Sequence, residues 1–115
     1  MIDISSFRDT VALYKKHGWE LMRLLLAGEP NDELLTVIGE VPVQQWKLDA
    51  AWFSRVSKPN TTTWELRYLG TPPIALVSVV AEGVDLEQEL AFQQEKLLEM
   101  MTKRHASETS QNGTS

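Results

Sequence analysis

Cysteine is absent from this chain of 115 residues, and histidine occurs only twice. The absence of thiols excludes disulfide bonds, thiolate nucleophiles and zinc sites built on cysteine. The two histidines, His17 and His105, lie near opposite ends of the sequence. A metal site needs several converging ligands, so we predict that the chain binds no metal.

Several motifs of catalysis and cofactor binding are also missing. The sequence contains no Gly-x-Ser-x-Gly, no Gly-x-Gly-x-x-Gly and no Gly-x-x-x-x-Gly-Lys, which are the patterns of serine hydrolases and nucleotide-binding loops. Carboxylates are plentiful, and Asp49 and Glu65 lie close to aromatic residues in the sequence. They could form an acid–base pair, but a turn cap for Asp49 and cross-strand pairing with arginine for Glu65 are the simpler roles. We therefore predict no cofactor and no catalytic residues.

Long hydrophobic runs and concentrated positive charge are lacking too. No apolar stretch approaches the roughly 20 residues that span a bilayer, and the start of the sequence lacks the basic and apolar regions of a secretory signal. The net charge is −5, and the only tight basic cluster is Lys15-Lys16-His17. These features predict a cytoplasmic protein that binds neither nucleic acid nor membranes.

Helical periodicity is clear over residues 3–17, where Asp3 or Ser5 can cap the first turn. The following stretch, 19–27, is ambiguous. Its good helix formers favour continuation through Gly18, whereas a basic run followed by glycine favours a stop, with a strand after it. We weigh both and lean to the strand.

The middle of the chain predicts a short helix over 32–38, ended by Gly39, and an extended segment over 41–43. Residues 49–57 favour a strand narrowly over a helix. Alternation over 61–68 predicts a half-buried antiparallel strand. The apolar run 74–80 predicts its hairpin partner, apolar enough to be central in the sheet.

A long helix is expected from Val84 or Asp85 to about Arg104, with an apolar stripe through Leu86, Leu90, Leu97 and Met101. Residues 106–115 carry no large apolar side chain, so we expect a disordered polar tail. The chain is thus predicted to be a single domain over 1–105, followed by that tail.

Tryptophan is abundant, with four in the chain. Trp19, Trp52 and Trp64 fall in the predicted sheet, where they either fill the core or line a pocket. Trp46 lies in a polar run and is a candidate for an exposed interface residue. On the long helix, Phe92 and Leu98 lie off the apolar stripe on different sides, and they are further candidates for a dimer or partner contact.

The triplet Trp-Glu-Leu occurs twice, at 19–21 and 64–66, but the flanking residues share nothing and no duplication is inferred. The order Gly18-Trp19-x-Leu21, then residues 48–55 (LDAAWFSR), then residues 64–67 (WELR) resembles short, uncharacterised bacterial proteins of similar length. This resemblance implies an α+β domain and favours a strand at the first triplet. It implies no activity.

Together these patterns predict an α+β domain with an antiparallel sheet of three to four strands. The N-terminal helix and the long C-terminal helix are expected to pack on one face of it. The function expected first is a non-catalytic interaction or binding domain with a protein partner or a second copy. The alternative is a small-ligand binder or enzyme with a tryptophan-lined pocket between sheet and helix.

Overall fold

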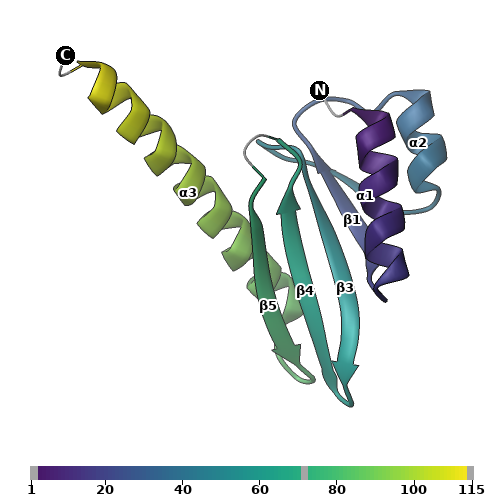
Figure 1. Cartoon of the computed structure of the whole chain (residues 1–115). Helices are drawn as coiled ribbons and strands as arrows, with labels where there is room; N and C mark the ends of the chain where they lie inside the picture. Colours follow the sequence, from purple (N-terminus) through teal and green to yellow (C-terminus); the bar gives the residue numbers. More distant parts are fainter. Residues whose placement is uncertain (1–2, 71–72, 114–115) are drawn as a thin grey trace. The chain divides into compact units, whose positions relative to one another are not determined.

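The computed structural model describes residues 3–70 and 73–113, with side chains as far as Lys103. Within these residues the fold is α+β, with one five-stranded mixed sheet and three helices. The chain divides into two parts, Met1–Gly83 and Val84–Ser115. The first part holds the sheet and two helices (Figure 1), and the second holds one long helix.

The first helix, α1 (Ile4–Lys16), begins and ends where its sequence signals lie. The Asp3 carboxylate caps it by accepting hydrogen bonds from the Ser5 amide and the Ser6 hydroxyl, at 3.2 and 2.8 Å. Gly18 follows the helix with a φ of 87°, in the left-handed region that favours glycine. The chain then enters β1 (Glu20–Leu26). The strand that was favoured over a continued helix for residues 19–27 is therefore confirmed.

The sheet has the strand order β2-β1-β3-β4-β5. After β1 the chain forms α2 (Asp32–Ile38), capped by Asn31, and then β2 (Val43–Gln45), which runs parallel to β1. The strands β3 (Ala50–Lys58), β4 (Thr61–Tyr68) and β5 (Ala75–Ala81) follow as antiparallel neighbours. The predicted strands over 49–57 and 61–68 are thereby confirmed.

Two predictions about the sheet were wrong. It is mixed and five-stranded, whereas three to four antiparallel strands were expected, because α2 carries the chain back so that β2 pairs parallel to β1. The extended segment near Pro42 was expected, but a strand of three residues is too short to recognise from alternation. The strand over residues 74–80, expected to be central, forms β5 at the sheet edge.

One face of the sheet carries the core of the first part. In Figure 1, α1 and α2 lie beside β1, away from β5. Buried apolar side chains from α1, α2, β1 and β3 form this core: Phe7, Leu24, Leu26, Leu34, Ile38, Ala51 and Phe53. The strand register places Trp52, Trp64 and Leu66 on the opposite face, where they are also buried. The sheet is therefore apolar on both faces around β3.

The second part consists of α3 (Leu86–Gly113). The Asp85 carboxylate accepts a hydrogen bond from the Gln88 amide at 3.2 Å, which confirms the predicted start of the helix. Further along the helix, Lys103 and Glu99 form an exposed ion pair at 3.2 Å. The tail expected over 106–115 stays a prediction: helical backbone is described as far as Gly113, and residues 114–115 lie outside the described residues.

Candidate functional site

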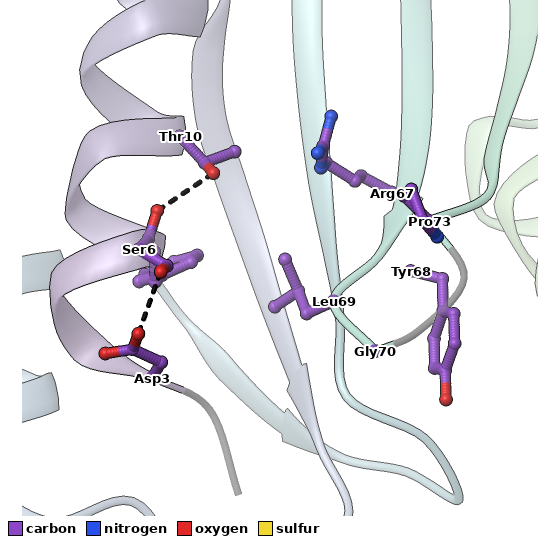
Figure 2. A pocket seen from close by; sticks show the side chains of 9 residues that line it. Asp3, Ser6, Thr10, Arg67, Tyr68, Leu69, Gly70 and Pro73 are labelled. Carbon is purple, nitrogen blue, oxygen red and sulfur yellow. Dashed lines mark hydrogen bonds between the residues drawn. The ribbon is translucent and has the colours of Figure 1, made fainter.

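A cavity of about 170 Å³ lies between α1 and the end of β4 (Figure 2). On the helix side, Thr10 donates a hydrogen bond to the Ser6 carbonyl at 2.9 Å, and Ser6 donates to Asp3. From the other side Leu69 points towards α1, whereas the ring of Tyr68 points away from it. Arg67 supplies a positive charge to the cavity wall.

Arg67 also belongs to a polar cluster with Tyr14 and Glu65. The Arg67 Nη1 donates to the Tyr14 hydroxyl oxygen at 3.2 Å, and the hydroxyl in turn donates to Oε2 of Glu65. Glu65 and Arg67 are two residues apart on β4 and therefore project from the same face of the sheet. The phenol of α1 thus bridges a carboxylate and a guanidinium of β4.

Aromatic contacts hold the Tyr14 ring in place. It stacks on Phe53 with 4.0 Å between ring centroids and meets the edge of Trp19 at 6.1 Å. The guanidinium carbon of Arg67 lies 5.6 Å from the centre of the Tyr14 ring. Similarly, Arg55 lies 5.8 Å from the Trp19 ring and donates to the His17 carbonyl at 3.4 Å. The cluster is thus built from side chains of α1, β3 and β4, three elements that the sequence patterns predicted.

The surroundings of Tyr14 favour its neutral form. Burial of the half-buried phenol raises its pKa above the ordinary value of 10.0, and the hydrogen bond to Glu65 acts in the same direction. Arg67 opposes the shift through its own hydrogen bond and charge, but it does not outweigh the other two. At neutral pH the phenol is therefore a hydrogen-bond donor locked to a carboxylate, not a base.

Residues of the cluster also line a second hollow. It has a volume of about 200 Å³ and is lined by Leu13, Tyr14, His17, Trp19 and Glu65. Trp19 also lines a groove of about 370 Å³ with apolar residues of α1, α2 and β1. Drug-sized ligands usually occupy roughly 300–1,000 Å³. The groove falls inside that range, and the two smaller hollows fall below it.

The tryptophans predicted to line one pocket lie in different places. Trp52 and Trp64 meet edge to face at 6.1 Å and 79°. Trp19 instead packs against the core that contains Phe53, on the other face of the sheet. The structure therefore brings two of the three together. Of these tryptophans, only Trp19 lines any of the hollows described above.

The candidate interface residues also lie in separate elements. Trp46 follows β2, where it is half-buried and its amide donates to the Leu26 carbonyl at 2.8 Å. On α3, Phe92 is 60% exposed and Leu98 is partly exposed. Six residues separate them, so they point to different sides of the helix. Their role in binding stays a prediction.

The hydrogen bonds of Asp49 and Glu65 differ from the turn cap and the arginine pairing expected of them. Asp49 accepts a hydrogen bond from the Ala27 amide at 2.9 Å and ties β3 to the end of β1. Glu65 bonds to Tyr14, a partner that the sequence did not indicate because 51 residues separate the two.

The sequence reasoning missed the exposed valines of β5. Val77 and Val79 are 57% and 65% exposed, on the same face of the sheet as Glu65. The signal was the apolar run 74–80, which was interpreted as a strand in the centre of the sheet. An edge strand next to an uncovered part of the sheet face exposes every second side chain instead.

Comparisons with known proteins add no family to this description. No family model, no curated protein and no solved structure matches the chain. Within the described residues, no helix is long and apolar enough to cross a membrane. In that same part of the chain, no group of three or more His, Cys, Asp or Glu side chains could hold a metal ion.

Proposed function

We propose that this chain is a small non-catalytic interaction domain that binds a protein partner or a second copy of itself. The observation that carries the proposal is the exposed apolar surface of β5, centred on Val77 and Val79. Single exposed apolar residues are common, but two valines with Ala75 and Ala81 form a row along one strand. Such a row is a suitable contact for another protein.

The polar cluster supports a binding role over a catalytic one. Tyr14, Glu65 and Arg67 satisfy one another, and the phenol is held neutral. A general base must be free to accept a proton from a substrate. In this cluster the carboxylate already accepts a hydrogen bond from the neutral phenol, so the cluster serves to fasten α1 to β4.

The experiment is a pull-down from native lysate with the immobilised full chain, followed by mass spectrometry. The matched control is the variant V77K/V79K, whose exposed positions accept lysine without loss of core packing. We expect either a partner that the wild type retains and the variant loses, or self-association in solution. A wild-type chain that is monomeric and captures nothing specific would overturn the proposal.

The second candidate is a small-ligand binder, favoured by the 370 Å³ groove that Trp19 lines. Apolar side chains from α1, α2 and β1 line it, together with Lys15 and Glu20. A ligand bound there should quench tryptophan fluorescence when a metabolite panel is added. Trp19→Phe should abolish that quenching, whereas quenching retained in this variant would argue against the groove.

Three finer expectations remain part of the proposal. The C-terminal helix is proposed to offer Phe92 or Leu98 to a partner. The composition, which includes no cysteine, favours a cytoplasmic protein. The low positive charge favours a protein partner over nucleic acid.

A further inference from the structure

We infer that two copies of this chain pair through the open edge of β5, antiparallel and in a register centred on Ser78, so that two sheets join into one. This inference rests on the proposed interaction function and names the partner as a second copy. It concerns only β5 and its neighbour β4.

The first argument is the direction of the backbone groups. At the two ends of the β4–β5 ladder, the Tyr68 amide donates to the Ile74 carbonyl and the Glu82 amide to the Asn60 carbonyl, both at 2.8 Å. In an antiparallel ladder, alternate residues point both backbone groups at the neighbour. Even-numbered residues of β5 therefore face β4. The odd-numbered residues Ala75, Val77, Val79 and Ala81 direct their amides and carbonyls to the open edge.

The second argument is that the same four residues are exposed. Val77 and Val79 are 57% and 65% exposed, and Ala75 and Ala81 are exposed as well. Within the part of the chain that the structure describes, β4 is the only strand paired with β5. One set of residues thus offers both a free hydrogen-bonding edge and an apolar row, which is what a strand adding to this edge needs.

The third argument is the symmetry of the strand sequence, Ala-Leu-Val-Ser-Val-Val-Ala. A two-fold axis at Ser78 places Val77 opposite Val79 of the second copy and Ala75 opposite Ala81. Leu76 then lies opposite Val80, so side chains of similar kind meet on both faces. This register uses all four outward-facing residues of each copy, and a shift of the axis by one residue leaves some of them unpaired.

The fourth argument is charge. Copies of a chain with net charge −5 repel one another overall. The segment Ala75–Ala81 carries no charge, and it contains no proline or glycine. Edge strands commonly carry lysine or proline that prevents pairing. In the proposed register Glu82 lies opposite Ile74, so no like charges face each other across the new ladder.

The size of the contact sets the expected strength. Stable interfaces bury about 1,600 Å² in total, and those below about 1,200 Å² are weak or transient. A contact confined to one seven-residue strand from each copy is small, so it belongs with the weak or transient interfaces. We therefore expect a reversible dimer whose population rises with concentration from the micromolar to the millimolar range.

The test uses two double variants of the full chain, V77K/V79K and V77E/V79E. In the proposed register position 77 faces position 79 of the second copy, so each variant places like charges opposite each other. Each should lose at least about tenfold in self-affinity. An equimolar mixture should form a heterodimer, because opposite charges then face each other. Sedimentation velocity over a concentration series compares the wild type, the two double variants and their mixture.

The matched control is V56K. Val56 is 76% exposed and lies opposite Thr62 of β4 on β3, which is not an edge strand of the sheet. This variant adds one lysine to the same sheet, where the double variant adds two, and it should dimerise as the wild type does. Far-UV circular dichroism of every variant confirms that the chains compared are folded.

Amide exchange gives an independent measurement at the edge itself. The amides of Val77 and Val79 should exchange freely in dilute samples and slow at least about tenfold as the dimer forms. The amides of Leu76 and Val80 bond to β4 and should be protected at every concentration.

Three outcomes overturn the inference. They are a wild-type chain that stays monomeric up to millimolar concentration, a dimer that both double variants retain, and a dimer that Phe92→Glu abolishes while V77K/V79K does not. None of these removes the proposed interaction function. That function fails separately, when the pull-down captures no partner and the chain is also monomeric.

Discussion

Tyr14 of α1 donates its hydroxyl hydrogen to Glu65 of β4, across 51 residues of sequence. The same oxygen accepts a hydrogen bond from Arg67, so one phenol satisfies a carboxylate and a guanidinium at once. The stacking of the ring on Phe53 continues the contact into the core. This side chain therefore joins the first helix to the middle of the sheet.

Tyr14→Phe should test this junction. The variant keeps the stacked ring but removes the hydroxyl, leaving Glu65 and Arg67 without their bridge. We expect a loss of about 1 kcal/mol in the free energy of unfolding, measured by urea denaturation. The control is Tyr68→Phe, which removes the other tyrosine hydroxyl and should change stability by less than about 0.5 kcal/mol. Equal stability of Tyr14→Phe and the wild type would contradict the bridging role.

Alkaline pH should weaken the same junction. Burial and the hydrogen bond to Glu65 raise the pKa of Tyr14 in the folded chain above its unfolded value of about 10. The stabilisation that depends on the neutral phenol is complete below that value and is lost as the pH rises through the folded pKa. Wild type should therefore lose stability between pH of about 10 and the folded pKa, and Tyr14→Phe should lose less. Parallel pH profiles for the two proteins would exclude a shifted Tyr14.

Gly18→Ala should be costly for a backbone reason. Gly18 has a φ of 87°, and an added Cβ would meet only the Arg55 side chain at an ordinary distance of 3.8 Å. The left-handed conformation itself costs a non-glycine residue about 1–2 kcal/mol, so unfolding should become easier by that amount. Gly28→Ala is the matched control, because no atom lies within 4 Å of an added Cβ there. A stabilised Gly18→Ala would mean that the helix can continue through this position.

The predictable part of the fold is the part that local signals specify. Asp3, Gly18 and Asn31 mark the ends of α1 and the start of α2, and each occupies the position that its chemistry favours. The alternation of apolar and polar residues also predicted β4, because successive side chains of a strand point to opposite faces of the sheet. The parallel strand β2 has no such signal. Its three residues are placed by pairing with β1, a contact that no local pattern encodes.

The candidate site was less predictable than the fold. Glu65 could be recognised as a polar residue near arginine, but its partner Tyr14 counted only as part of an apolar stripe. The prediction that 74–80 lies centrally in the sheet was wrong because strand order is a tertiary property. A strand that is buried on both faces and a strand that is exposed on one face can carry the same run of apolar residues. Val77 and Val79 are therefore informative only once the sheet order is known.

Asn60 should behave as a second left-handed position, with its own substitution pattern. It has a φ of 62° in the turn between β3 and β4, and its carbonyl accepts the Glu82 amide at the end of β5. Asparagine tolerates this conformation better than other residues with a Cβ. Asn60→Ala should therefore lose about 1 kcal/mol, whereas Asn60→Gly should match or exceed the wild type. Because the two variants remove the same amide side chain, their difference isolates the backbone effect. Thermal or urea unfolding measures it, and equal losses in both variants would assign the effect to the side chain instead.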